Sequence, residues 1–281
     1  MKRGLSWLLA LSLLLASLLS LTACFGKTLK LVDINLTDES YAVAVKKGNA
    51  ELLGTVNATL DAIKKDGTLD KILNKYFNED ENSYLKVSAG VESPSDRDSQ
   101  LIVATHSQFR PFEFSKYESG KGKMYSGIDI EIAAIIAERT GKELIIKEMD
   151  FDKLLTAVDE GDADIAIASL TVNEERGKIV DFSTPYYSSS QVLIIKDNDK
   201  TFKSCKTRAD VEKILKDMGS SLTVGGQSET TGLSYISAFG VTTKGYASAV
   251  LASQALINGE VDVVVFDKEH AKKIVDGVNK D

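Results

Sequence analysis

Short apolar runs alternate with amphipathic stretches along most of this chain, and this alternation restricts its fold more than any other feature. Strands separated by helices of about ten residues pair in parallel sheets that carry helices on both faces. The pattern predicts an α/β fold in which ligands bind beyond the carboxyl ends of the strands. Beyond residue 100, strands are expected at residues 101–104, 144–147, 165–168, 191–195, 222–225 and 261–266, and helices at 129–140, 151–160, 208–218, 230–238, 246–258 and 268–275.

The first hundred residues add a smaller set of elements. Strands are expected at residues 29–32 and 41–45, and a helix at 50–65 with apolar residues along one face. Thr68 is expected to cap a second, short helix that ends near Phe77. Residues 78–100 are rich in serine and acidic residues and have weak periodicity, so their composition predicts a linker.

Charge and composition exclude several classes of protein. The 281 residues include 34 Lys and Arg against 41 Asp and Glu, a net charge of −7, so the basic footprint of a nucleic-acid-binding protein is missing. Two cysteines and two histidines cannot form a structural zinc site or a disulfide framework. We therefore predict no metal, no cofactor and no nucleic-acid partner.

The N-terminus has the composition of an export signal. Lys2 and Arg3 precede an uncharged, leucine-rich stretch that ends in Leu21-Thr22-Ala23-Cys24. This ending resembles the lipobox of bacterial lipoproteins, which implies a signal peptide over residues 1–23 and a lipid on Cys24. The alternative is an uncleaved signal anchor, because the apolar run is long enough to span a bilayer. Both interpretations place the body outside the cytoplasm, tethered to a membrane on the periplasmic or cell-surface side.

Six segments, in this order, resemble the polar amino-acid-binding proteins of bacterial ABC importers. That family has the two-lobed type II fold of periplasmic solute-binding proteins, in which two crossover strands join α/β lobes that close on an amino acid. The resemblance implies the same fold here, binding without catalysis, and delivery of the ligand to an ABC permease by a monomer. The segments are Phe-Arg-Pro-Phe-Glu-Phe at 109–114, Gly-Ile-Asp-Ile-Glu at 127–131, Thr-Val-Asn-Glu-Glu-Arg at 171–176, Val-Asp-Phe-Ser-Thr-Pro-Tyr-Tyr at 180–187, residues 225–232 and residues 261–267.

The order of the segments departs from the family pattern. A stretch similar to residues 37–70 ends the family's chains, whereas here it comes first. The resemblance therefore implies a circular permutation, with lobe 1 over residues 41–190, including the linker 78–100, and lobe 2 formed by residues 24–40 and 191–281. The rival interpretation treats residues 25–77 as the remnant of a lost neighbouring domain.

Arg176 and Asp267 are the predicted anchors of the ligand. Arg176 lies three residues after Asn173, a good helix N-cap, and a guanidinium matches a carboxylate with two parallel hydrogen bonds. Asp267 follows a buried strand, and a ligand ammonium would give its carboxylate a partner. The resemblance assigns them to the carboxylate and amino group of an amino acid. Without the resemblance, Arg176 would be interpreted as a surface arginine and Asp267 as the N-cap of the next helix.

The resemblance also assigns a surrounding set of contact residues. The family's hydroxyl and backbone contacts to the ligand match Ser169, Thr171, Thr230 and Thr231. Serine and threonine at the start of a helix are also common as plain N-caps. Glu229 replaces a residue that is usually glycine. Phe109 and Phe151 match the two aromatic positions that sandwich the ligand side chain in the family. The alternative is that both are ordinary phenylalanines of the hydrophobic core. Gln227 and His106 match positions near the ligand side chain, and at His106 many relatives carry an aspartate, which weakens the case for lysine or arginine as ligand.

Two other functions remain open from the sequence. A dehydratase or lyase on the same lobes would need an acid–base pair, for which His106 with Glu113 or Glu229 are the candidates. A sensor subunit would present its closed form to a separate signalling protein. His270 lies on a predicted helix and is expected to be solvated or packed structurally.

Overall fold

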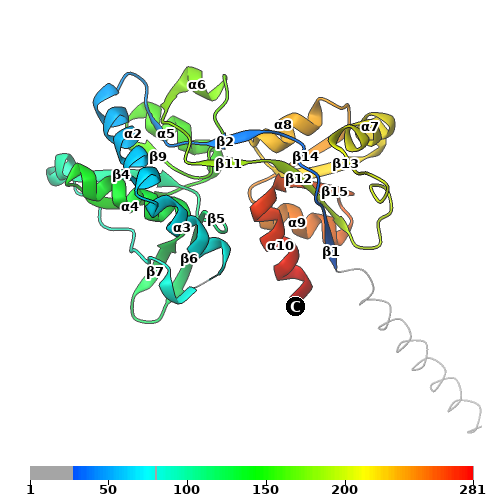
Figure 1. Ribbon diagram of the computed structural model, residues 1–281, viewed down its shortest axis with the longest axis horizontal. Coiled ribbons are helices and arrows are strands. Elements are labelled where there is room, and N and C mark those ends of the chain that lie inside the picture. The colour runs from blue at the N-terminus through cyan, green and yellow to red at the C-terminus, as the bar shows by residue number, and fades with distance from the viewer. Residues whose placement is uncertain (1–27, 80, 281) are drawn as a thin grey trace, which may run out of the picture.

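The chain folds into two lobes that lie side by side and are joined by a pair of extended segments (Figure 1). The structure is a computed structural model that describes residues 28–79 and 81–280. The predicted signal peptide and Cys24 lie outside these residues. Among the helices of the described residues, none combines the length and the apolar character needed to cross a bilayer.

Lobe 1 is built on a mixed five-stranded sheet. Its order is β10 (Val180–Phe182), β3 (Ala44–Lys46), β9 (Ile165–Ala166), β4 (Gln100–Thr105) and β8 (Glu143–Glu148). β4 runs parallel to β8 and β9, whereas β3 runs antiparallel to β9 and β10. A separate small sheet consists of β5 (Gln108–Phe109), β6 (Glu113–Glu118) and β7 (Gly122–Ser126).

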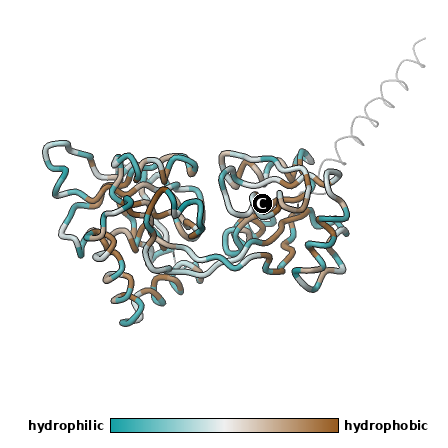
Figure 2. The backbone as a smooth tube through the Cα atoms, turned by 90° about the horizontal axis from the view of Figure 1, so that it is seen from above, coloured by the Kyte–Doolittle hydropathy of each residue, from teal (hydrophilic) through white to brown (hydrophobic). Residues whose placement is uncertain are grey.

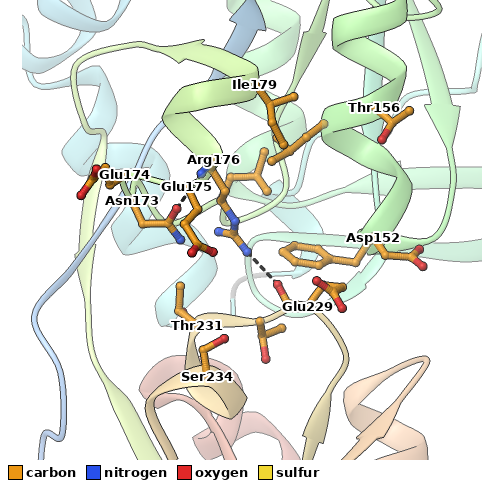
Figure 3. Close-up of a pocket in the computed structure, with 14 residues that line it drawn as sticks. Asp152, Thr156, Asn173, Glu174, Glu175, Arg176, Ile179, Glu229, Thr231 and Ser234 are labelled. Carbon is orange, nitrogen blue, oxygen red and sulfur yellow. Dashed lines mark hydrogen bonds between the residues drawn. The ribbon is translucent and has the colours of Figure 1, made fainter. Parts of the chain in front are cut away.

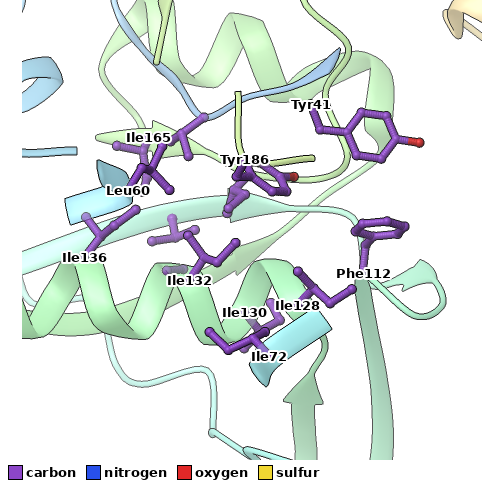
Figure 4. Packing of buried hydrophobic residues seen from close by; sticks show 14 of the residues in the cluster. Tyr41, Leu60, Ile72, Phe112, Ile128, Ile130, Ile132, Ile136, Ile165 and Tyr186 are labelled. Atoms are coloured by element: carbon purple, nitrogen blue, oxygen red, sulfur yellow. The ribbon is translucent and has the colours of Figure 1, made fainter. Parts of the chain in front are cut away.

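Helices cover both faces of this sheet because successive side chains of a strand point in opposite directions. Leu101 and Val103 of β4 belong to the core that α2 (Ala50–Lys65), α3 (Thr68–Phe77) and α4 (Ile128–Thr140) complete. Figure 4 shows Ile132 and Ile136 of α4 on the side of Leu60 and Ile165. Ile102 and Ala104 instead face the core completed by α5 (Leu154–Glu160). The short helix α6 (Arg176–Ile179) follows β9 along the chain.

Lobe 2 repeats this plan with a second mixed sheet. Its order is β1 (Leu29–Val32), β12 (Gln191–Lys196), β15 (Val263–Asp267), β13 (Thr223–Gln227) and β14 (Thr242–Tyr246). One face packs against α7 (Arg208–Met218) and α8 (Thr231–Ser237), and the other against α9 (Ala249–Asn258) and α10 (Lys268–Lys280). Figure 2 shows the hydrophobic segments running through the interior of each lobe.

Two strands connect the lobes. β2 (Glu39–Tyr41) and β11 (Tyr187–Ser189) pair antiparallel to each other, so the chain crosses between the lobes twice along one two-stranded ribbon (Figure 1). The predicted two-lobed α/β fold with two crossover strands is confirmed. The sheets are mixed rather than purely parallel because β1, β3, β10 and β12, which lie next to the crossovers in the chain, run antiparallel to their neighbours.

Local predictions fail where tertiary packing interrupts a sequence pattern. The expected strand over residues 41–45 is divided between β2 and β3, because the chain leaves the crossover ribbon at Tyr41 and enters the lobe 1 sheet at Ala44. The N-cap of α3 is Gly67 rather than Thr68, and the Thr68 amide donates to Asp66. Tyr246 ends β14, and α9 begins only at Ala249, capped by the Ser248 hydroxyl.

The segment predicted as a linker packs against lobe 1. Val87 pairs with Tyr125 of β7, and the amide of Ile146 in β8 donates to the carbonyl of Ala89 at 2.7 Å. Gly90, with φ of +75°, lies so close to Ile145 that a Cβ would contact it at 2.7 Å. Composition alone did not predict these contacts, because they use backbone groups.

Replacing Gly127 tests the packing of lobe 1. Gly127 has φ of +129°, and a Cβ at this position would lie 2.0 Å from the carbonyl oxygen of Phe112. Gly127→Ala should therefore destabilise the protein by about 2 kcal/mol or more. Gly54→Ala is the matched control, since Gly54 lies exposed in α2 with open space around it and should gain about 0.5–1 kcal/mol. Denaturant unfolding of both variants measures these changes, and equal effects would contradict the packing described.

Candidate functional site

A small cavity lies between the lobes, and every residue that the sequence analysis put forward as ligand-binding lines it. Its volume is about 20 Å³, room for about one water molecule, so the lobes lie closed on one another. Glu113 and Ala168 complete the lining. Lobe 1 contributes His106, Phe109, Glu113, Phe151, Ala168, Ser169, Thr171 and Arg176, and lobe 2 contributes Gln227, Thr230, Thr231 and Asp267.

A wider mouth of about 590 Å³ opens beside this cavity and shares four residues with it, Phe151, Arg176, Thr230 and Thr231. Figure 3 shows acidic side chains around this mouth, with the guanidinium of Arg176 between them. The mouth is therefore a predominantly acidic opening around one cation. The acidic residues are Asp152, Glu174, Glu175 and Glu229.

Arg176 lies at the start of α6, where Asn173 accepts a hydrogen bond from its amide at 2.8 Å. Its guanidinium donates to the carbonyl of Thr171 at 2.9 Å and, across the cleft, to the carbonyl of Glu229 at 3.0 Å (Figure 3). Burial lowers the pKa of Arg176, although nearby carboxylates oppose that shift. Within the described part of the chain both acceptors are neutral carbonyls, so the cation is available for an anionic ligand group.

Asp267 ends β15 on the opposite lobe. Its carboxylate accepts hydrogen bonds from the hydroxyl of Tyr41 in β2 and from that of Ser189 in β11 at 3.3 Å. Burial raises the pKa of Asp267 to about 7, and the negative charge of Glu39 adds to the shift. None of the described lysines or arginines forms an ion pair with it. A cationic ligand group would supply the missing partner.

Glu39 is a cleft residue that the sequence analysis missed. It lies on the crossover strand β2 and is buried, and its carboxylate accepts hydrogen bonds from Thr171 of lobe 1 at 2.7 Å and Thr231 of lobe 2 at 3.0 Å. Gln191 also donates to it, at 3.2 Å. The sequence gives no signal of burial here, because Glu39 follows Asp38 in a polar stretch that resembles an exposed turn.

Glu113 and Asp129 form a second acidic group, in and beside the cavity. Glu113 lines the cavity, and its neighbour Asp129, at the start of α4, is fully buried. Ser169 holds both, donating its hydroxyl to Glu113 at 3.1 Å and its amide to Asp129 at 2.7 Å. Burial raises the pKa of Glu113 well above its usual range and that of Asp129 to about 6. Ser169, with φ of +51°, therefore positions the two carboxyl groups.

Two histidines join the lobes around the cavity. Nδ1 of His106 contacts the carbonyl of Met149 at 3.1 Å, so its Nε2 is the acceptor for Gln227 across the cleft at 3.2 Å. His270 of α10 stacks on Phe109, with ring centroids 3.9 Å apart. Burial lowers the pKa of His270 to about 4. His270 is therefore packed rather than solvated.

His106 and Glu113, considered for acid–base catalysis, both line the cavity, but they form no hydrogen-bonded pair among the described residues. Among the described residues, the hydrogen-bond partners of His106 are Met149 and Gln227, and neither Glu113 nor Glu229 hydrogen-bonds to it. Within the same part of the chain no group of His, Cys, Asp and Glu side chains could hold a metal ion. The geometry combines one guanidinium from lobe 1 with one carboxylate from lobe 2, which suits a small ligand that carries both charges.

The sequence model of the bacterial extracellular solute-binding proteins, family 3, matches residues 10–79 and 101–230, more than half of the chain. The chain belongs to this family. Its resemblance to amino-acid-binding proteins, stated above from six segments, is thereby confirmed at the level of the family. The match divides into two segments, and the stretch between them includes Val87 and Ala89, which hydrogen-bond to β7 and β8 of lobe 1.

Individual relatives of this solute-binding protein are amino-acid-binding proteins by name. It is 33% identical over 107 residues to the arginine-binding extracellular protein ArtP of Bacillus subtilis, covering 38% of this chain and 40% of that protein. It is 31% identical over 173 residues to a probable histidine-binding protein of Campylobacter jejuni, covering 61% of each. The chain thus spans less than two thirds of these curated relatives.

Solved structures with the same fold include AbpA of Streptococcus pneumoniae bound to L-arginine, at 33% identity and a TM-score of 0.56 over 63% of this chain and 71% of that one. A mutant of ArgBP from T. maritima is 30% identical, with a TM-score of 0.55 over 64% of this chain and 72% of that one. An ancestral amino-acid-binding protein, described as a precursor of cyclohexadienyl dehydratase, is 26% identical. Its TM-score is 0.54 over 63% of this chain and 74% of that one.

Replacing Asp267 should stabilise this solute-binding protein in a pH-dependent way. The pKa of Asp267 rises from 3.8 to about 7 in the fold, so ionising it costs stability as pH increases between those values. Asp267→Asn removes that cost while its amide oxygen still accepts from Tyr41. The variant should melt several degrees higher at pH 8, by about 1 kcal/mol or more, and the difference should vanish toward pH 4.

The exposed residue Asp38 provides the control for this experiment. Asp38→Asn should leave the melting temperature within about a degree of the wild type at both pH values. A melting temperature of Asp267→Asn that is equal to or below the wild type at pH 8 would contradict the energetic cost assigned to the carboxylate.

Proposed function

We propose that this solute-binding protein captures a polar L-amino acid between its lobes and delivers it to an ABC permease. The observation that supports this most strongly is the position of Arg176 and Asp267 on opposite walls of one cavity. An amino acid carries a carboxylate and an ammonium a few ångströms apart, so it offers each wall its complementary charge. Only the closed form satisfies both, and the ligand therefore shifts the equilibrium toward closure.

The ligand side chain should be basic. The cavity and its immediate surroundings hold the carboxyl groups of Glu39, Glu113, Asp129 and Asp267 against the single guanidinium of Arg176. A positive side chain near Glu113 and Asp129 would offset part of this excess. The acidic mouth would also draw a cationic solute inward. Relatives named for arginine and histidine binding support this choice, although His106 replaces an expected aspartate.

The protein should act outside the cytoplasm as a lipoprotein held by Cys24, and as a monomer without turnover. Leu21-Thr22-Ala23-Cys24 supports the lipid anchor. Within the described residues neither Glu113 nor Glu229 hydrogen-bonds to His106, which favours binding over a dehydratase or lyase reaction. A sensor role finds no support in any specific contact of the described residues.

We further propose that the chain is a circular permutation of its family, with lobe 1 over residues 41–190 and lobe 2 formed by residues 24–40 and 191–281. The side chain of Asn279 in α10 hydrogen-bonds to both the amide and the carbonyl of Leu29 in β1, each at 2.9 Å. The end of lobe 2 therefore lies beside its first strand. A short loop could join them, as a family member with the usual order would require.

A ligand screen tests the proposed function. Thermal shift against the natural amino acids should show stabilisation by arginine, lysine or histidine, of about 2.7 kcal/mol at a hundredfold excess over the dissociation constant. Arg176→Ala should weaken binding of that ligand roughly a hundredfold by calorimetry, because a ligand carboxylate loses its charged partner. Arg208→Ala on the surface of α7 is the matched control and should bind like the wild type. Tight binding of glutamate, or unchanged binding by Arg176→Ala, would contradict the assignment.

Restoring the family's order tests the permutation. A gene that begins at Glu79, runs to Lys280, joins it through a short glycine-serine loop to Thr28 and ends at Asn78 keeps the packed segment of residues 84–92, and it should fold and bind the same ligand. Its affinity should lie within about threefold of the wild type, because the loop spans neighbouring groups. A rearranged chain that fails to fold, while a control with the same loop inserted at Gly120 folds normally, would contradict the proposal.

A further inference from the structure

The buried carboxylate of Glu39 accepts hydrogen bonds from two cavity hydroxyls. Thr171 and Thr231 line the cavity from opposite lobes, and both donate to the same oxygen of Glu39, at 2.7 and 3.0 Å. Gln191 donates to that oxygen at 3.2 Å, and Thr37 to the other at 3.1 Å. Four donors thus converge on a side chain that is 8% exposed. An ionised carboxylate, which only accepts hydrogen bonds, suits such a site.

A threonine hydroxyl has one proton and two lone pairs. With both protons directed to Glu39, Thr171 and Thr231 can only accept hydrogen bonds from a molecule in the cavity. Asp267, on the same cavity wall as Thr231, is also an acceptor. Thr171, Thr231 and Asp267 thus offer three of the cavity's acceptors, as many as a primary ammonium group has N–H donors.

We propose that Glu39 is a positioning residue for amino-group selectivity: by holding the protons of Thr171 and Thr231, it makes the cleft prefer a ligand with a free ammonium group over one with a hydroxyl at the same carbon. This inference rests on the proposed function. A 2-hydroxy acid keeps the carboxylate for Arg176 and the side chain, but it has one donor in place of three and no positive charge. Glu39 exerts this effect without touching the ligand, since it is absent from the cavity lining.

The test compares the affinities of an amino acid and its 2-hydroxy acid by calorimetry. The amino acid is the tightest ligand found in the screen. Glu39→Met removes the acceptor at similar volume, and it should reduce the preference for the amino acid at least tenfold, mainly by weakening amino-acid binding. Glu39→Gln keeps an acceptor oxygen for the two hydroxyls, so it should retain the preference within about threefold. Asp38→Met, at the exposed neighbour, is the matched control and should behave like the wild type.

Several outcomes would overturn the proposal. A preference unchanged in Glu39→Met, a loss of affinity for both ligands by the same factor, or an equal loss of preference in Glu39→Gln would each exclude control through the hydroxyl protons. If Glu39→Met does not fold, the variants Thr171→Val and Thr231→Val test whether the two hydroxyls set the preference for the amino acid. Each should lower the preference, and unchanged preference in both would refute the role of Glu39. Failure of the wild type to bind any amino acid would instead refute the proposed function itself.

Discussion

The structure depends on how a small cavity accommodates a cluster of buried carboxyl groups. Glu39, Glu113, Asp129 and Asp267 lie in or beside it, and Arg176 is the guanidinium in its lining. Buried carboxylates are costly without hydrogen bonds or cations. Hydroxyl and amide donors of the protein stabilise them in part, and the raised pKa values of Asp129 and Asp267 show that the stabilisation is incomplete.

The crossover ribbon supplies much of this stabilisation and is therefore part of the site. β2 contributes both Glu39 and the Tyr41 hydroxyl that donates to Asp267, and Ser189 of β11 donates to the same carboxylate. A connection between lobes usually needs only to bend. Here the connecting strands also hold polar groups from both walls, so any separation of the lobes changes the hydrogen bonds of the groups proposed to bind the ligand.

Contacts that join the lobes surround the cavity on several sides. Arg176 reaches the carbonyl of Glu229, Gln227 reaches His106, and His270 stacks on Phe109. Lys273 of α10 pairs with Glu79 of lobe 1 at 2.7 Å. Each contact is polar or aromatic and small, which suits a closure that must be reversible. The apolar cores lie within the lobes, so opening would expose little hydrophobic surface.

The sequence by itself determined the alternation of strands and helices, because hydrophobic periodicity is local. The resemblance of its short motifs to a known family implied the two-lobed class and most of the cavity residues. Arg176 and Asp267 were assigned through that resemblance, because their local sequence fits a surface arginine and a helix N-cap equally well. Tertiary structure decided that β3 and β12 run antiparallel, that residues 84–92 pack on lobe 1, and that Glu39 is buried. These outcomes depend on which distant segments meet: Glu39 is enclosed only because Thr171 and Thr231, 132 and 192 residues away along the chain, converge on it.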